Sequence, residues 1–500
     1  MTIEVPRLSG QTLSALDPAV RRPRFNRETT GIGVAHLGVG AFMRSHIAEY
    51  CDDALEAEGG DWAIAGFSLR RPSVRDRLDP QDCYYVLGAR DGANEQRRLI
   101  GALRSLQVAP ENPRAVVRLL AAPHVRTVTL TITEKGYCLD ADSGVLSLDH
   151  PDIRHDLGHP DEPRSAMAFL VAGLRERMTA SRTPPDVLSC DNLPANGVRL
   201  RSAVLAFAHE LDPKLANWIA ANVAFPVTMV DRIVPATTEF DIAENAERTG
   251  LRDEAYVKTE PFRQWVIEDA FRNERPAWEA GGALFVTDVA PFETAKLRLL
   301  NGPHSTIAYL GYLAGFDYVH EAMANTAFAE FIAQMMIDDI APVTPEPSEM
   351  NHAAYIEELL KRFRNAALEH RTWQIAMDGS QKIPQRILST VRAQLKRGGP
   401  IASLSLAVAG WMRFALGRDE RGNPIEVSDP LAARFSGIAA AGLTDPEEIV
   451  GRFLAIREIF GIDLPERMRF RSAVSNSLRQ LLESGAAETV RRFIALENEP

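Results

Sequence analysis

Short apolar runs rich in β-branched residues alternate with helical patterns in the first part of the chain. Five such runs are predicted to be strands: 33–37, 62–69, 125–133, 187–190 and 227–234. Between them, residues 163–178 and 198–210 place apolar side chains three and four positions apart, as an amphipathic helix does. This alternation predicts an α/β domain with a mostly parallel sheet flanked by helices.

After about residue 290 the strand signal fades and long helical patterns replace it. Helices are predicted over 306–312, 328–337, 355–363, 401–416 and 446–460. The turn-rich segment 288–291 marks the junction. Because 500 residues exceed the roughly 250–300 that one hydrophobic core serves, we expect two domains, an α/β domain over 1–290 and a mostly α-helical one over 291–500.

The charge balance restricts the classes of binding partner that we expect. The chain has 56 basic against 67 acidic residues, a net charge of −11, whereas nucleic acids and anionic membranes call for a basic face. We therefore expect neither as a partner. The N-terminus lacks a secretion signal and no apolar run reaches the roughly 18 residues of a membrane span, so a cytoplasmic protein is expected. A monomer and a homodimer fit the sequence equally well.

A glycine turn follows the first predicted strand. Gly38 and Gly40 lie in the segment 38–46 with Phe42 and Arg44, after which residues 47–55 look helical. A strand, a glycine turn and a helix start let backbone N–H groups approach a pyrophosphate, and Arg44 is placed to meet phosphate. Met43 replaces the third glycine of the dinucleotide fingerprint, and a simple tight turn would explain the two glycines equally well.

The end of the second predicted strand leaves the choice of dinucleotide open. An acidic residue usually binds the ribose hydroxyls there, but this chain has Arg70 and Arg71. Arginine at this place can hold the 2′-phosphate of NADP, so NADP is not excluded beside NAD. The alternative is that both arginines are merely solvated.

A lysine, an asparagine and a histidine just after the junction form the strongest chemical pattern. Helical spacing allows Lys296, Asn301 and His304 to converge, and Asn192 follows a predicted strand. Oxidation of a secondary alcohol needs a base and donors for the developing alkoxide, roles that Lys296 and Asn301 can fill, and a cleft between domains is where a substrate is expected. The chain has only seven lysines, and a desolvated lysine can release its proton whereas arginine in effect cannot. The competing interpretation is a helix start with Asn301 as a cap and Lys296 on the surface.

The spacing of tyrosines, lysines, cysteines and histidines excludes the catalytic residue sets of other dehydrogenase classes. No lysine has a tyrosine four residues before it, and the cysteines and histidines offer no zinc set. We therefore expect a reaction without a metal.

Several segments together resemble the mannitol dehydrogenase family, the polyol-specific long-chain dehydrogenases. They run in one order from about residue 30 to about residue 480 and comprise 38–46, 133–137, 189–193, 225–233, 296–304 and 377–384. The resemblance implies a Rossmann-type first domain, a mostly helical second domain and NAD(P)-linked interconversion of a polyol or aldonate with the matching ketose or ketouronate. It implies Lys296 as general base, Asn192 and Asn301 as the oxyanion-stabilising pair, and His304, Asp231 and Lys382 at the substrate. Glu134 and Lys135 also match, and their place at a predicted strand end is consistent with a cofactor contact, with a buried ion pair as the alternative.

Within the family, residues 370–382 look closer to fructuronate reductases, which reduce D-fructuronate to D-mannonate. Gln374 stands where mannitol 2-dehydrogenases carry an arginine. A carboxylate substrate needs a cation, which Arg371 or Lys382 can supply. The sequence thus predicts a small sugar acid as substrate, with a polyol such as mannitol as the alternative. A dinucleotide-binding sensor without chemistry is the rival from another class.

Overall fold

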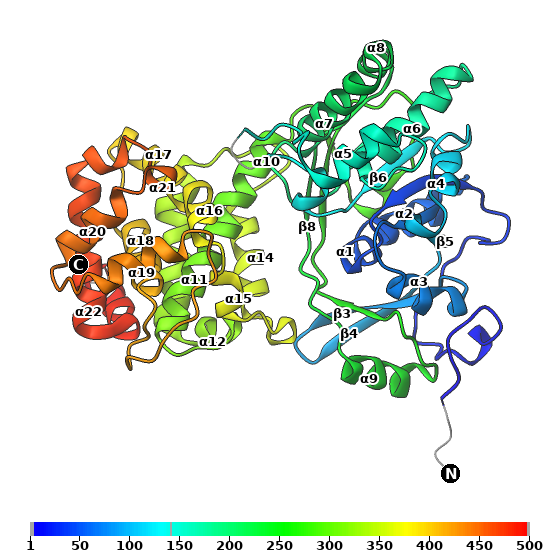
Figure 1. Ribbon diagram of the computed structural model, residues 1–500. Coiled ribbons are helices and arrows are strands. Elements are labelled where there is room, and N and C mark those ends of the chain that lie inside the picture. The colour runs from blue at the N-terminus through cyan, green and yellow to red at the C-terminus, as the bar shows by residue number, and fades with distance from the viewer. Residues whose placement is uncertain (1–4, 141–142, 498–500) are drawn as a thin grey trace. The chain divides into compact units, whose positions relative to one another are not determined.

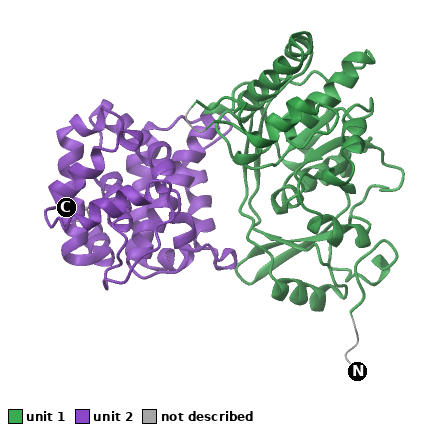
Figure 2. Cartoon of the chain, viewed as in Figure 1, with its two compact units in different colours: residues 1–290 green, residues 291–500 purple. Residues whose placement is uncertain are grey.

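The computed structural model describes residues 5–140 and 143–497. The chain divides into two compact units, residues 1–290 and 291–500, which Figure 2 shows in green and purple. Each unit is described by itself below.

A five-stranded parallel sheet forms the centre of the first unit. Its strand order is β5-β2-β1-β6-β7. The strands are β1 (Ile32–Leu37), β2 (Ala63–Ser68), β5 (Leu103–Val108), β6 (Thr127–Leu130) and β7 (Asp186–Ser189) (Figure 1). This is the order of the first five strands in a doubly wound dinucleotide-binding fold, so the prediction of a mostly parallel sheet is confirmed.

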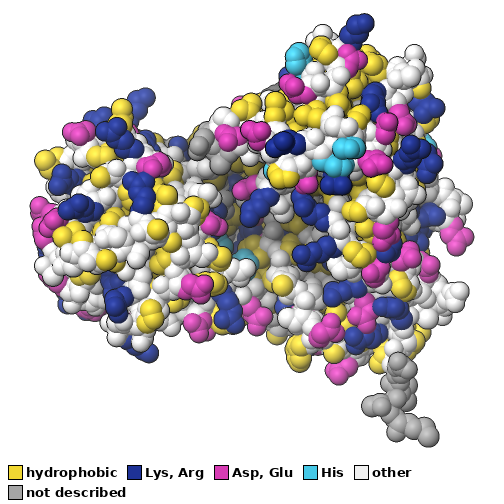
Figure 3. All heavy atoms as spheres, in the orientation of Figure 1, with side chains coloured by type: hydrophobic (Ala, Val, Ile, Leu, Met, Phe, Trp, Pro, Cys, Tyr) yellow, Lys and Arg dark blue, Asp and Glu magenta, His cyan; other side chains and the backbone are white. Residues whose placement is uncertain are grey.

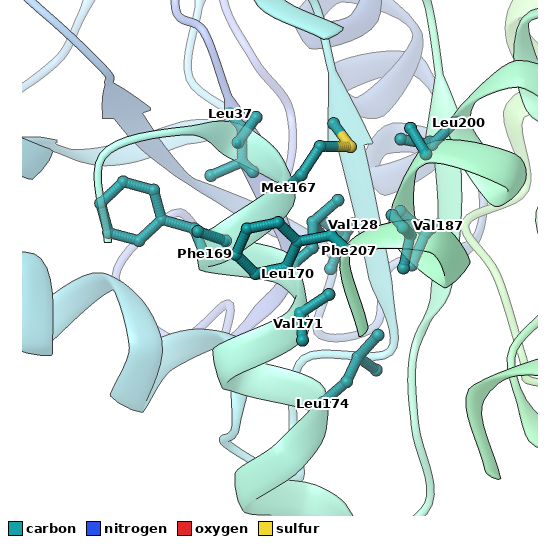
Figure 4. Close-up of a cluster of buried hydrophobic side chains, with 14 of the residues drawn as sticks. Leu37, Val128, Met167, Phe169, Leu170, Val171, Leu174, Val187, Leu200 and Phe207 are labelled. Atoms are coloured by element: carbon teal, nitrogen blue, oxygen red, sulfur yellow. The ribbon is translucent and has the colours of Figure 1, made fainter. Parts of the chain in front are cut away.

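Helices cover both faces of this sheet because neighbouring strand residues point to opposite sides. In β1, Ala35 and Leu37 belong to one buried cluster and Val34 to another. The helices of the unit are α1 (Ala41–Ser45), α2 (Ile47–Glu58), α3 (Ser73–Leu78), α4 (Pro113–Leu120), α5 (Pro151–Gly158), α6 (Ala166–Thr179), α7 (Asn196–Leu211), α8 (Pro213–Asn222) and α9 (Glu239–Thr249). Figure 4 shows side chains of α6 and α7 among those of β1, β6 and β7.

Two three-stranded sheets complete the first unit, and the sequence analysis missed most of their strands. One has the order β11-β10-β8, and the other β4-β3-β9. Their strands are β3 (Tyr85–Asp91), β4 (Asn94–Ile100), β8 (Thr228–Asp231), β9 (Val257–Thr259), β10 (Gln264–Glu268) and β11 (Leu284–Val286). The segment predicted over 227–234 is indeed a strand, but β8 pairs antiparallel with β10 and lies outside the parallel sheet.

The second unit is helical, as predicted. Its α-helices are α10 (Ala290–Ala295), α11 (Gly302–Leu313), α12 (Val319–Ala324), α13 (Thr326–Gln334), α14 (His352–Arg364), α15 (Thr372–Ala376), α16 (Gly379–Ile383), α17 (Ser389–Arg397), α18 (Ala402–Ala415), α19 (Ala432–Ala440), α20 (Pro446–Leu454), α21 (Arg457–Phe460) and α22 (Met468–Glu497). Gly485, with a φ of 77°, interrupts α22. Three segments have π-helical hydrogen bonding: η6 (Lys296–Asn301), η7 (Met335–Ile340) and η10 (Pro384–Leu388).

The distribution of charged side chains on the surface agrees with the mixed acidic and basic composition of the chain. On the face drawn in Figure 3, basic and acidic side chains are interspersed within each unit, with hydrophobic side chains scattered among them. Among the described residues, no helix combines the length and the apolar character that a membrane crossing requires.

A buried arginine on α6 binds the loops that precede β6 and β7. The guanidinium of Arg177 donates hydrogen bonds to the carbonyl oxygens of Leu120 (2.8 Å), Ala122 (2.7 Å), Val125 (2.7 Å) and Thr183 (2.5 Å). Its residue exposure is 1%. One side chain therefore satisfies four carbonyl groups that no strand or helix pairs.

We predict that Arg177→Met destabilises the first unit by about 3 kcal/mol or more, because buried carbonyls lose a charged donor. Urea unfolding followed by tryptophan fluorescence measures this. Arg175→Met is the matched control, since Arg175 lies on the same helix in an exposed ion pair with Asp161 and should change stability by less than about 1 kcal/mol. Equal effects of the two substitutions would contradict the prediction.

Candidate active site

The chain leaves β1 through a turn that only glycine can form. Gly38 has a φ of +96°, and a Cβ there would lie 2.1 Å from the carbonyl oxygen of Thr131, just after β6. The order of the sheet reverses between β1 and β6, which is where doubly wound folds bind ligands. The two loops at this point are therefore in direct backbone contact.

Gly40, unlike Gly38, has open space where a side chain would be. It is the N-cap of α1, and a Cβ there would meet no atom within 4 Å. Phe42 follows in α1 and stacks on His46, with ring centroids 4.8 Å apart. Met43, at the place of the missing third glycine, is fully buried in the core. The turn thus keeps an open glycine, and the helix behind it packs through a large apolar side chain.

Arg44 lies against main-chain carbonyls. Its guanidinium donates to the carbonyl oxygens of Gly40 (3.3 Å) and Ala255, and burial lowers its pKa. The hydroxyl of Tyr85 donates to the carbonyl oxygen of Arg44 at 2.7 Å. These contacts give Arg44 a structural task, and a phosphate contact stays a prediction.

A buried histidine that the sequence analysis did not single out joins β1 to β6. His36 lies within hydrogen-bonding distance of the hydroxyls of Thr129 (2.8 Å) and Thr131 (2.9 Å). Burial lowers the pKa of His36 to about 3, so the ring is neutral near pH 7. Thr131 in turn donates to the carbonyl oxygen of Gly38 at 2.7 Å. His36 therefore helps to hold the two strand ends that form the glycine turn.

The carboxylate of Asp191 organises the next two strand ends. It accepts hydrogen bonds from the backbone N–H groups of Ile132 (3.0 Å) and Thr133 (2.9 Å) and from the hydroxyl of Tyr137 (2.8 Å). Tyr137 also contacts the hydroxyl of Ser189 at the end of β7. Burial raises the pKa of Asp191, and these hydrogen bonds oppose that shift. One side chain thus ties the loop after β6 to the loop after β7.

The same loop carries Asn192, and a second amide links it to β8. The side chain of Asn196 donates to the carbonyl oxygens of Ser189 (3.0 Å) and Asp191 (3.2 Å). Its amide oxygen accepts from the N–H of Thr228 at 2.9 Å. Asn192 is exposed at the start of this loop, and Asp231 is buried at the end of β8. The backbone that bears both candidate residues is therefore fixed by the same buried network.

Three further candidates for cofactor binding lie at the surface of the first unit. Glu134 and Lys135 are exposed in the short helix η4 (Glu134–Tyr137). Arg70 follows β2, and its side chain is 74% exposed beside Asp152, with a 3.2 Å ion pair. Their roles at a cofactor stay predictions.

In the second unit, one π-helical segment carries both Lys296 and Asn301. A π-helix bonds residue i to residue i+5, so residues five apart lie nearer to one face than in an α-helix, where they are about 140° apart. Lys296 begins this segment and is 8% exposed, and Asn301 ends it. Lys296 is therefore not a surface lysine, whereas Asn301 does stand at the N-cap of α11, with no side-chain capping bond.

The neighbouring π-helical segment brings a third candidate close. A Cβ on Gly302 would lie 2.9 Å from the carbonyl oxygen of Arg386, so this glycine allows η6 to pack against η10. Arg386 donates to the hydroxyl of Ser305 at 3.0 Å. Lys382, in α16 two residues before η10, donates to the carbonyl oxygens of Ile375 (3.2 Å) and Met377 (2.5 Å).

His304 lies in the first turn of α11 with an unusual neighbour. Its ring stacks on Phe363 at 5.5 Å and lies 5.4 Å from the ring of His370. Burial lowers the pKa of His304 well below the usual value, and the neighbouring bases Arg386, Arg362 and Lys382 lower it further. Burial also lowers the pKa of His370 to about 4, so this ring is neutral near pH 7. The sequence analysis gave His370 no role of its own.

Arg371, which with Lys382 was predicted as the cation for a carboxylate, is placed differently. It is exposed, and its guanidinium lies 5.3 Å from the centre of the Tyr318 ring. Lys382 is close enough to His304 to lower its pKa, and Lys296 and Asn301 are the two ends of η6, but Arg371 faces solvent. Within the described ranges, no three His, Cys, Asp or Glu side chains are arranged to hold a metal ion.

Comparison with known proteins agrees with both units. Residues 32–280 match the model of the mannitol dehydrogenase Rossmann domain, and residues 288–482 match that of the mannitol dehydrogenase C-terminal domain. The chain belongs to the mannitol dehydrogenase family. The predicted Rossmann-type fold and the oxidoreductase class are thereby confirmed.

Three relatives illustrate the range of this family. The chain is 43% identical to D-mannonate oxidoreductase of Escherichia coli (strain K12), covering 94% of this chain and 97% of that protein. It is 39% identical to mannitol 2-dehydrogenase of Aspergillus fumigatus, covering 95% of each. Among solved structures, the Pseudomonas fluorescens mannitol 2-dehydrogenase ternary complex with NAD and D-mannitol is 36% identical, with a TM-score of 0.84 over 98% of this chain and 99% of that one.

We predict that Asp191→Ala destabilises the first unit by about 2–4 kcal/mol, because two amide groups and a hydroxyl lose their buried acceptor. Hydrogen exchange at the amides of Ile132 and Thr133 should become faster as the stability of the unit falls. Asp161→Ala serves as control, since the Asp161 side chain is 77% exposed in its ion pair. Unchanged exchange at both amides in the Asp191 variant would refute the proposed hydrogen bonds.

Proposed function

We propose that this protein is an NAD-dependent, metal-independent oxidoreductase that interconverts a hexonate and its ketone, with D-mannonate and D-fructuronate as the pair. The observation that carries the proposal is the π-helical segment η6, which begins at the buried Lys296 and ends at Asn301. A lysine that can exchange a proton and an amide that can donate to the developing alkoxide are the groups that alcohol oxidation requires.

The first unit supplies the features of a dinucleotide site. Gly38 closes the turn after β1, and Gly40 leaves space where backbone N–H groups can face a pyrophosphate. The Pseudomonas fluorescens relative was solved with NAD, which supports NAD here. Arg70 is exposed at the end of β2, where a 2′-phosphate would lie, so NADP is the alternative.

In reduction, a nicotinamide cofactor held at the turn of Gly38 and Gly40 would supply the hydride for the ketone carbon of the substrate. The amides of Asn192 and Asn301 hold the carbonyl oxygen, which gains negative charge as the hydride arrives. Lys296 donates a proton from its ammonium group to this oxygen, leaving a neutral amine. In oxidation the neutral amine removes the hydroxyl proton, so the two directions need opposite protonation states of one nitrogen.

Substrate class separates two related proposals. The D-mannonate relative is 43% identical and the Aspergillus mannitol relative is 39% identical. This difference, together with the resemblance of residues 370–382 to fructuronate reductases, favours a hexonate. Mannitol with fructose is the alternative, since mannitol 2-dehydrogenases align over 95% and 97% of this chain.

We predict that kcat/KM for D-fructuronate exceeds that for D-fructose by at least about tenfold with NADH at neutral pH. Initial rates of NADH and NADPH oxidation with both substrates measure this. Preference for fructose would instead assign a mannitol-type dehydrogenase. Tight NADH binding without turnover of either substrate would indicate a sensor.

We also predict that Lys296→Ala lowers kcat by about a hundredfold or more, because proton transfer by a positioned group contributes at least that much. In the unmodified enzyme, reduction should slow and oxidation should accelerate as pH rises and Lys296 loses its proton. Lys361→Ala is the matched control, since Lys361 lies on the surface of the same unit in an exposed pair with Glu357. A threefold or smaller loss in the Lys296 variant would exclude its role as the base.

A further inference from the structure

The segment that bears His370 is held in an extended conformation against the turn before α12. The N–H of Val319 donates to the carbonyl oxygen of His370 at 3.0 Å, and the N–H of Thr372 donates to that of Asp317 at 2.9 Å. Between these bonds, Arg371 forms an antiparallel bridge with Tyr318. Three consecutive residues therefore follow the geometry of a strand.

Strand geometry sends neighbouring side chains to opposite sides. Arg371 points to solvent over Tyr318, and Thr372 is fully buried. The ring of His370 lies on the other side from Arg371 and faces His304 at 5.4 Å. The alternation explains why the histidine reaches the site and the adjacent arginine does not.

The surroundings of the two rings call for an anionic or hydroxyl ligand. Nε2 of His304 is buried and has no hydrogen-bond partner within the part of the chain that the structure describes. An orphaned buried nitrogen is costly unless a ligand completes it. The ionisable groups that act on His304 most strongly are His370, Arg386, Arg362 and Lys382, all bases. The local electrostatic potential therefore favours negative charge.

We propose that His370 is a substrate-binding residue which, with His304, forms the subsite for the carboxylate of a hexonate and sets the preference for hexonate over hexitol. This inference rests on the proposed function, since it concerns the same substrate. It assigns the carboxylate to His370, the neighbour of Arg371, whereas the sequence offered Arg371 or Lys382 for this contact.

A carboxylate gains more from this subsite than a hydroxymethyl group does. It accepts a hydrogen bond from the imidazole N–H of His370, and its charge is stabilised by the cations Arg386, Arg362 and Lys382 around His304. A neutral end group can accept the same hydrogen bond, but a hydrogen bond to a charged acceptor is roughly twice as strong as one between neutral groups. Loss of His370 should therefore affect the acid more than the neutral sugar.

The test compares the full-length protein with His370→Ala and His370→Gln, using D-fructuronate and D-fructose with NADH. We expect kcat/KM for fructuronate to fall about tenfold to a hundredfold in the alanine variant, mainly through KM, and kcat/KM for fructose to change less than about threefold. Glutamine retains an N–H donor and should restore part of the loss. His320→Gln is the control, because His320 stacks on Tyr318 at 5.5 Å near the same turn.

Equal losses with both substrates, with circular dichroism unchanged, would assign His370 a structural role and overturn the inference. Selective loss of fructuronate activity in Arg371→Gln and not in His370→Ala would overturn it in favour of the arginine. If His370→Ala fails to fold, His370→Gln alone decides, by the ratio of the two substrates. An unmodified enzyme that ignores fructuronate would refute the proposed function itself, and this inference with it.

Discussion

The first unit depends on a fixed contact between the ends of two parallel strands. Parallel strands end at one edge of a sheet, where their loops have no further strand to pair with, so other groups must hold them. Gly38 and Thr131 meet backbone to backbone, and His36 bridges the strands beneath them. Asp191 and Asn196 extend the same support to β7 and β8. The loops that carry the candidate binding residues are therefore held by hydrogen bonds and close packing, although they lie outside the sheet.

The second unit solves the same problem by different means. Here the candidate groups lie on helices, and one helix takes π-helical hydrogen bonding from Lys296 to Asn301. Gly302 then lets this segment approach the carbonyl oxygen of Arg386 in the next π-helical segment. In both units a glycine allows close backbone packing, and buried polar contacts hold the chain around it. The chemistry thus rests on backbone geometry as much as on side-chain identity.

Much of this organisation could be predicted from the sequence because burial imposes a period on apolar residues. β1 and the helices α6, α7 and α18 lie where the pattern indicated. β3 and β4 were missed because their residues, such as Arg90 and Arg97, are charged, and antiparallel strands outside the main sheet need no apolar run. Lys296, Asn301 and His304 were recognised from their spacing and family resemblance. His370 and Asp191 were not assigned roles, because their contacts come from residues distant in sequence.

The three π-helical segments restrict how the second unit can evolve. η6 packs against both η7 and η10, and each π-helical turn holds more residues than the α-helical turn it replaces. Removing one residue from such a segment would favour the α-helical spacing and rotate every later side chain by about 100° around the axis. Insertions and deletions are therefore excluded from these helices, and relatives of different length should differ instead in loops such as 418–431. In an alignment of the family, the segments without gaps would therefore include those that form the site.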